Sequence, residues 1–253
     1  MRPARQPRIA VGRPLALFVS LVLLLVACGE AEEPVAPDAT SEAVSFRAAD
    51  DVRLEGRLFG DGATAVVLSH MRPADQSSWW DFADELADEG YLALTYNFRG
   101  YCPGGTVGCS DGDRNTEAIW QDVLGAIDFV RSRGAGRVML IGASMGGTAS
   151  LIAASRDGVD ADVVITLSAP VAFEGLAASP DVLTRIRAAK LFIAGVDDGS
   201  AAGSAQTLYD RSPPPKRLEI LTTGDHGTDI LEGNQGGPAR TLILTYLSQY
   251  SDA

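Results

Sequence analysis

Residues 137–156 have the sequence RVMLIGASMGGTASLIAASR. RVMLIG is mostly apolar, as in a buried strand, and GGTASLIAASR has the composition of a helix. Between them, Gly142-Ala143-Ser144-Met145-Gly146 matches the pattern Gly-x-Ser-x-Gly. The glycines relieve crowding in a tight strand-to-helix turn, which holds Ser144 at the carboxyl edge of a sheet beside a helix N-terminus. Ser144 is therefore the candidate nucleophile.

Elsewhere, short β-branched runs alternate with helical patterns, which predicts an α/β domain with a mostly parallel sheet and crossover helices. We expect eight strands, at residues 43–47, 52–59, 64–69, 91–96, 137–141, 162–167, 190–194 and 217–221. The first two alternate polar and apolar residues, as an antiparallel pair with one wet face does. The later strands are continuously apolar, so we expect inner strands covered by helices on both faces.

The N-terminus has the layout of a secretory signal. Residues 1–14 carry four arginines and no acid, and the uncharged run LALFVSLVLLLVA follows from Leu15 to Ala27. This run is shorter than the roughly 20 residues that a membrane-spanning helix needs. It ends at Leu25-Val26-Ala27-Cys28, which resembles the lipobox of bacterial lipoproteins. The resemblance implies cleavage after residue 27 and acylation of Cys28, and a plain secretion signal is the alternative.

The next segment, residues 28–42, is acidic, rich in Ala and Pro and poor in large apolar residues, which is typical of a flexible tether. We therefore expect a signal peptide over residues 1–27, an acylated Cys28 with its tether over 28–42, and one folded domain over 43–253. This organisation predicts an extracytoplasmic lipoprotein, anchored to a membrane of the bacterial cell envelope.

The charge balance argues against nucleic acid as a partner. The formal net charge is −12, and removal of residues 1–27 would leave 17 basic residues against 33 acidic ones. Such a surface disfavours polyanions. The sequence contains no phosphate loop, zinc signature or dinucleotide fingerprint, so we expect neither a cofactor nor a metal.

The cysteine count predicts one disulfide. With Cys28 assigned to lipid, Cys102 and Cys109 remain as an even pair outside the reducing cytosol. A metal site is the alternative, but the further histidines or cysteines that zinc requires are not nearby.

Several segments together resemble the α/β-hydrolase superfamily, notably its small dienelactone-hydrolase-like and carboxylesterase-like members. They are the order of the strands, the GASMGG turn, AGVDD at residues 194–198 and GDHG at residues 224–227. The likeness extends over residues from about 43 to 250. It implies an eight-stranded hydrolase fold and a triad of serine, acid and histidine.

A serine hydroxyl needs a positioned base, and the chain holds two histidines, His70 and His226. The superfamily order of serine, then acid, then histidine implies His226. Its acid usually stands in Gly-x-x-Asp after a late strand, which maps onto Asp198. Asp197 is the alternative, because a shift of one residue would exchange the two carboxylates. Ser144, His226 and Asp198 thus form the implied triad.

The same resemblance implies an oxyanion hole made by backbone N–H groups. One belongs to Met145, directly after the nucleophile. The other comes from the loop in SHMRPADQSSWW, where methionine replaces the usual glycine, and it is the amide of Arg72 or that of Met71. We expect His70 to support this loop by hydrogen bonding. The Arg72 side chain either reaches an anionic substrate group or lies in solvent.

Two further segments concern the surroundings of the site. The segment YNFRG, residues 96–100, resembles the superfamily's Asp-x-Arg-Gly with Asn97 in place of the aspartate. The insertion with Cys102 and Cys109 that follows is either part of the site rim or surface decoration. Residues 169–188 suffice for a loop and a short helix but not for a full cap domain, which predicts an open site.

The sequence therefore predicts a serine hydrolase that acts on a small-molecule ester through an acyl-enzyme. A thioesterase or acyltransferase would use the same triad. From another class, the alternative is a non-catalytic binding lipoprotein of the cell envelope that keeps the fold. The physiological substrate and the oligomeric state do not follow from the sequence.

Overall fold

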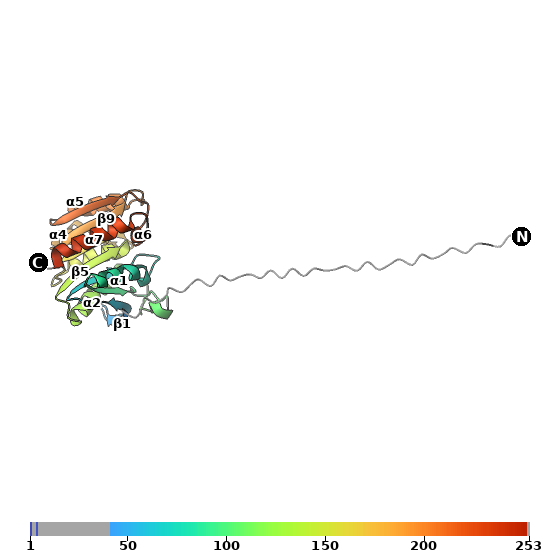
Figure 1. Cartoon of the computed structure of the whole chain (residues 1–253), viewed down its shortest axis with the longest axis horizontal. Helices are drawn as coiled ribbons and strands as arrows, with labels where there is room; N and C mark the ends of the chain where they lie inside the picture. The colour runs from blue at the N-terminus through green and yellow to red at the C-terminus, as the bar shows by residue number, and fades with distance from the viewer. Residues whose placement is uncertain (2–3, 5–40, 252–253) are drawn as a thin grey trace. The chain divides into compact units, whose positions relative to one another are not determined.

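The computed structural model describes residues 1, 4 and 41–251 (Figure 1). Residues 41–251 fall in one compact unit. The predicted signal peptide, the predicted lipid site Cys28 and nearly all of the tether lie outside the described residues. Within the described part, no helix is both long and apolar enough to cross a bilayer.

An eight-stranded sheet forms the centre of the domain, with its strands in the order β1-β2-β4-β3-β5-β6-β9-β10. The strands are β1 (Ser41–Arg47), β2 (Arg53–Phe59), β3 (Thr64–Ser69), β4 (Leu92–Tyr96), β5 (Arg137–Ala143), β6 (Val163–Leu167), β9 (Ala189–Gly195) and β10 (Lys216–Leu221). Strand β2 pairs antiparallel with β1 and with β4, and the other pairs are parallel. The predicted α/β fold, its antiparallel first pair and its apolar inner strands are confirmed.

Helices cover both faces of this sheet because alternate residues of each inner strand point to opposite sides. Along β3, Val66 belongs to one buried cluster and Val67 to the other. The Val66 cluster contains buried residues of α1 (Trp80–Asp88), α6 (Asp229–Glu232) and α7 (Gly236–Ser251). The Val67 cluster contains those of α2 (Ile119–Ser132), α3 (Met145–Ala154), α4 (Pro180–Arg185) and α5 (Ala201–Arg211). The result is a three-layer domain with two cores.

A small hairpin lies between β6 and α4, where we expected only a loop and a short helix. It consists of β7 (Ala172–Phe173) and β8 (Leu176–Ala177), which pair antiparallel. Its turn residues, Glu174 and Gly175, both have positive φ, at 42° and 89°. Strands of two residues are too short to show an alternating pattern, so the sequence carried no sign of this hairpin.

The parallel strands determine where polar loops gather. Strands β3, β5, β6 and β9 lie side by side and run in the same direction, as does β10 next to β9. Their carboxyl ends therefore meet at one edge of the sheet, which is where open α/β sheets bind ligands. The loops that carry the predicted triad and oxyanion residues, after β3, β5, β9 and β10, leave from this edge.

Candidate active site

Ser144 occupies a sharp turn between β5 and α3. Its backbone has φ 49° and ψ −119°, a conformation that is unusual for a residue with a side chain. The turn is possible because its glycines lack a Cβ: one added to Gly146 would lie 2.4 Å from the Ser69 carbonyl oxygen, and one on Gly142 would lie 2.4 Å from the Gly146 oxygen. The Ser144 N–H donates to the Leu167 carbonyl (2.8 Å), which ties the turn to β6.

The imidazole of His226 meets the carboxylate of Asp198. His226 Nδ1 lies 2.9 Å from both Asp198 carboxylate oxygens. The two residues come from the loops after β10 and β9, which adjacent parallel strands bring together. Asp197 is exposed and donates its backbone N–H to the Thr223 carbonyl (3.1 Å). Of the two candidate acids, Asp198 is thus the one that contacts the imidazole.

A cavity of about 340 Å³ contains the three residues of the predicted triad. Ser144, Asp198 and His226 line it together with the apolar side chains of Met145 and Phe173, among others. The His226 side chain is 41% exposed and that of Asp198 is 12% exposed. The imidazole can therefore meet a ligand, while its carboxylate partner is mostly shielded from water.

Two elements that carry the candidate oxyanion donors have residues that line this cavity. Met145 is the first residue of α3, and the first N–H groups of a helix have no intrahelical acceptor. The partial positive charge of a helix N-terminus also favours negative charge at that point. Of the two candidates in the loop after β3, Arg72 lines the cavity, whereas Met71 is buried. An oxyanion that forms near Ser144 would thus lie close to both elements.

His70 is buried completely. Its Nε2 accepts a hydrogen bond from the Phe98 backbone N–H (3.1 Å), so Nδ1 carries the proton and donates to the Met71 carbonyl (2.8 Å). Burial lowers the pKa of His70 to about 4, which keeps the ring neutral. The predicted support of the loop by His70 is thus present as a hydrogen bond to Met71.

The Arg72 side chain forms an ion pair, which neither of the two alternatives drawn from the sequence included. Its guanidinium forms a two-pronged ion pair with Glu174 of the β7–β8 hairpin, at 2.8 and 2.9 Å. It also lies 4.9 Å above the ring centre of Phe173. Both ends of this ion pair are largely exposed, at 41% and 48%. The contact joins the loop after β3 to the hairpin at the rim of the cavity.

Ser168, which follows β6, is a site residue that the sequence did not reveal. It lines the cavity, has φ 55°, and its Oγ accepts a hydrogen bond from the Gly227 N–H (3.1 Å). This bond holds the loop at the residue next to His226. A lone serine after a strand carries no motif, so only the fold brings this contact to light. Asp225 and Asp229, near His226 in sequence, belong to the loop and the start of α6.

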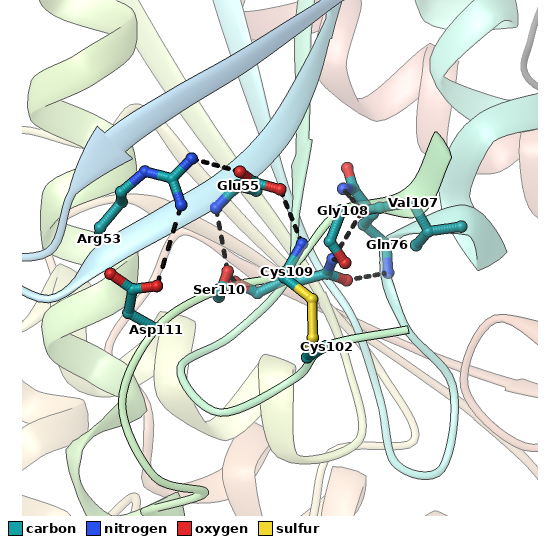
Figure 2. Close-up of polar contacts among 10 residues, drawn as sticks. Arg53, Glu55, Gln76, Cys102, Val107, Gly108, Cys109, Ser110 and Asp111 are labelled. Carbon is teal, nitrogen blue, oxygen red and sulfur yellow. Dashed lines mark hydrogen bonds and ion pairs between the residues drawn. A yellow bond between two sulfur atoms is a disulfide. The ribbon is translucent and has the colours of Figure 1, made fainter. Parts of the chain in front are cut away.

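The predicted disulfide between Cys102 and Cys109 is present (Figure 2). It closes a loop that contacts β2, because Glu55 accepts a hydrogen bond from the Cys109 N–H (2.7 Å). Within the described residues, no three acidic, histidine or cysteine side chains gather as a metal site would require.

A family model described as serine aminopeptidase, S33, matches residues 62–196, which is more than half of the chain. The chain belongs to this family. It is accordingly a serine hydrolase of the α/β-hydrolase fold. The matched segment includes Ser144 and the loop with His70 and Arg72, and it ends before Asp198 and His226.

Solved structures share the fold of this hydrolase at low sequence identity. An esterase from Pyrococcus furiosus superposes with a TM-score of 0.70 at 16% identity, over 83% of this chain and 91% of that one. An esterase from Exiguobacterium antarcticum gives 0.65 at 16%, over 82% and 100%, and an enol-lactonase from Burkholderia xenovorans gives 0.66 at 17%, over 80% and 99%. No functionally curated protein matches the chain with significance. At these identities the likeness shows the fold alone.

Proposed function

We propose that this hydrolase cleaves carboxylic esters, with Ser144 as nucleophile, His226 as base and acid, and Asp198 as the residue that orients the imidazole. The observation that carries the proposal is the contact between His226 and Asp198 at a cavity that Ser144 also lines. Because Asp198 engages Nδ1, the Nε2 of His226 is the nitrogen that can take the proton of Ser144.

The reaction proceeds in two halves. Ser144 Oγ attacks the ester carbonyl carbon while its proton passes to His226 Nε2, and the C–O bond to the alcohol breaks as the alcohol leaves with that proton. Water then attacks the acyl-enzyme and gives a proton to the same nitrogen, and the acid departs as Ser144 regains its hydrogen. We assign the developing oxyanion to the amides of Met145 and Arg72, with the Met71 amide as the alternative second donor.

The surroundings favour an ester over a peptide with a free amino end. An aminopeptidase site needs an acidic group to hold the substrate's charged amine, since a buried charge requires a partner. Among the residues that line this cavity, Asp198 is the one carboxylate, and it is already hydrogen-bonded to His226. Glu174, at the rim, is engaged by Arg72. The esterase fold neighbours are consistent with this choice of substrate.

The size of the cavity favours short acyl groups. About 340 Å³ is near the lower end of the range for small-molecule sites, and Phe173 of the hairpin and Ala201 of α5 are among its lining residues. We therefore propose a small-molecule ester as the substrate. A thioesterase or an acyltransferase would use the same residues and differ in the leaving group or the acceptor.

A binding lipoprotein that retains the fold without catalysis is the proposal's main rival. The backbone strain at Ser144 argues against it, since a strained residue persists where the surrounding structure enforces it, and such residues cluster at functional sites. Treatment with a fluorophosphonate followed by mass spectrometry separates the two. Labelling at Ser144, turnover of p-nitrophenyl acetate, and loss of both in Ser144→Ala would support the esterase. A folded protein with neither label nor turnover would support the binding lipoprotein.

We also propose that the enzyme is anchored by lipid at Cys28 on the extracytoplasmic side of a membrane in the bacterial cell envelope. The proposal rests on the arginine-rich start, the apolar run and the Leu-Val-Ala-Cys sequence. Replacing Cys28 by serine should move the protein from the membrane fraction to the soluble fraction without changing kcat. Membrane retention of Cys28→Ser would point to an uncleaved apolar anchor instead.

A further inference from the structure

The loop closed by Cys102 and Cys109 is hydrogen-bonded to the segment that carries Arg72. Gln76, the first residue of the 3-10 helix η1 (Gln76–Trp79), donates from Nε2 to the Val107 carbonyl at the centre of the disulfide loop (2.6 Å). Asn97, directly after β4, donates from Nδ2 to the same carbonyl (2.8 Å). Figure 2 shows Gln76 directed at this loop beside Val107 and Gly108.

Gln76, Asn97 and the Val107 carbonyl are joined by further hydrogen bonds between buried side chains. The Gln76 backbone N–H donates to Asn97 Oδ1 (3.1 Å), and Thr95 Oγ1 donates to Gln76 Oε1 (2.8 Å). Gln76 is 1% exposed and Asn97 is fully buried. Because a buried polar group is costly when it lacks a partner, each of these side chains fixes the position of the others.

The contact with the disulfide loop explains why position 97 is an asparagine. An aspartate, which the superfamily motif has here, could accept from the Gln76 N–H but would direct its other oxygen at the Val107 carbonyl oxygen. Asparagine offers a donor at that point and an acceptor at the other. The departure from the superfamily motif is thus what the carbonyl of the inserted loop requires.

The other end of the Arg72 segment packs against the residue that precedes the disulfide loop. Tyr101, next to Cys102, packs its ring against His70, with ring centres 4.6 Å apart. His70 in turn donates to the Met71 carbonyl. The segment of residues 70–76 is therefore held at its start through Tyr101 and at its end through Gln76.

The disulfide loop is in turn fixed to β2, so it can serve as a rigid support. Glu55 accepts from the Cys109 N–H, and its own N–H donates to Ser110 Oγ (3.0 Å). Ser110 Oγ donates to the Asn97 carbonyl (2.7 Å). These contacts, drawn in part in Figure 2, join β2, the disulfide loop and the end of β4.

We propose that Gln76 and Asn97 are positioning residues for the reaction: through the Val107 carbonyl of the disulfide loop they set the place of the Arg72 segment at the oxyanion. This inference rests on the proposed function, because it takes that segment as the source of the second oxyanion donor. An amide that is displaced from the oxyanion loses its effect in the transition state while substrate binding persists.

The test compares two variants that each remove one donor and keep the shape of the side chain, Asn97→Asp and Gln76→Glu. Using p-nitrophenyl acetate, we expect kcat to fall by about tenfold or more in each, since small displacements of catalytic groups and lost oxyanion donors have effects of this order or larger. KM should change by less than about threefold, because the ground state does not use the oxyanion hole fully. Inhibition by phenylboronic acid, which forms a tetrahedral adduct with serine, should weaken in parallel with kcat.

Arg53→Gln is the matched control. Arg53 of β2 pairs with Glu55 of the same strand and with Asp111, two residues beyond the disulfide loop, and its side chain is 41% exposed. Its replacement removes ion pairs beside the disulfide loop without removing a donor to Val107, so kcat should stay within about twofold of the parent, as expected for exposed pairs. Each protein is assayed well below its melting temperature, so that a loss of stability alone does not lower kcat.

A variant without the disulfide provides an independent test. In Cys102→Ser/Cys109→Ser the disulfide loop should hold Gln76 and Asn97 less firmly, so kcat should fall. Adding Asn97→Asp to this variant should lower kcat by a smaller factor than it does in the parent. This test also decides the question if Gln76→Glu or Asn97→Asp fails to fold. Normal kcat and boronic acid affinity in Asn97→Asp and in the cysteine variant, with Ser144 still labelled by fluorophosphonate, would overturn the positioning role alone. Loss of labelling in the parent protein itself would overturn the proposed function instead.

Discussion

The loops around His70 and His226 place the same side chain in opposite surroundings. His70 is buried, and both of its ring nitrogens are used by backbone groups of Met71 and Phe98. His226 is 41% exposed at the edge of a cavity, and one nitrogen is held by Asp198 while the other remains available. His70 is therefore suited to hold a loop in place, whereas His226 is suited to exchange protons.

The role of each histidine follows from the partners of its two ring nitrogens. A ring whose nitrogens both bond to the backbone has no free site for a substrate proton, and burial moves its pKa away from neutrality. A ring with a carboxylate on one side keeps the tautomer that a serine hydroxyl needs. Substitutions in the two loops should accordingly affect different quantities: stability for His70 and catalysis for His226.

The largest effect is expected from His226→Ala. We expect kcat for p-nitrophenyl acetate to fall by roughly 10⁵-fold or more, because the base and acid of both half-reactions is lost. The melting temperature should change little, since the side chain is partly exposed and lies at a cavity. Steady-state kinetics and thermal melts measure the two quantities. A loss of less than tenfold would show that another group takes the serine proton.

Asp198→Asn is expected to have the next largest effect. An amide cannot hold the imidazole in the tautomer that accepts the serine proton, and such a change costs roughly 10⁴-fold in kcat. Asp197→Asn is the matched control, because that neighbouring carboxylate is exposed, and its kcat should remain near that of the parent. If the two variants exchanged their effects, the acid would be Asp197.

The stability of the folded protein should depend on pH through His70. Its pKa is about 4 in the folded protein against 6.5 as the ordinary value, so the unfolded chain binds a proton more readily between these pH values. The contribution of His70 is thus complete above pH 6.5 and is lost as pH falls toward 4, which amounts to about 3 kcal/mol at 1.36 kcal/mol per pH unit. Urea unfolding between pH 4 and 8 measures it.

The control for this prediction is His70→Asn, which has no titrating group. The variant should be less stable at pH 7 because it loses a partner for Met71 or Phe98, and the decline of its stability between pH 6.5 and 4 should be smaller than that of the parent. Carboxylates elsewhere titrate in both proteins and cancel in the comparison. Identical pH dependence in the two proteins would mean that His70 is not the neutral buried group described above.

The smallest effect is expected at the rim, where Arg72 pairs with Glu174. Glu174→Gln frees the guanidinium beside the cavity, and an exposed pair contributes little to stability, so the melting temperature should hardly change. We consider two substrates: p-nitrophenyl acetate, which is neutral, and a p-nitrophenyl ester with a carboxylate at the far end of its acyl chain. At low salt, the kcat/KM of the variant for the charged ester, divided by its kcat/KM for p-nitrophenyl acetate, should exceed the same ratio in the parent by about threefold. This gain should vanish at high salt. A gain that persists at high salt would contradict an electrostatic origin.

The sequence allowed the sheet to be predicted closely because inner strands of a parallel sheet are continuous apolar runs. All eight predicted strands are present, and their ends differ from prediction by two residues at most. The β7–β8 hairpin escaped prediction because two-residue strands carry no periodicity, and its Glu174-Gly175 turn is not among the sequence pairs that favour hairpin turns. Local pattern thus predicts elements that bury a full face and misses those stabilised by a few contacts.

The residues of the candidate site also differ in whether the sequence alone could predict them. Ser144 stands in a motif that reflects the local geometry of a turn, so the sequence pointed to it directly, whereas His226 was implied by the order of the triad in the superfamily that the sequence resembles. The choice between Asp198 and Asp197 depends on the direction of a loop, which the sequence left open and which the contact with His226 now favours. Contacts such as those of Ser168 with Gly227 or of Gln76 with Val107 join segments far apart in the chain, and no local pattern records them.

The direction of β1 has a practical consequence. Ser41 pairs with Phe59 of β2, and Phe59 pairs with Ala93 near the start of β4, so the chain enters the domain at the edge of the sheet opposite to Ser144. A solid support or fusion partner joined ahead of Ser41 would hold the domain from this opposite edge. Immobilisation through the N-terminal side should therefore leave the mouth of the cavity accessible to dissolved esters, as a flow reactor or biosensor requires.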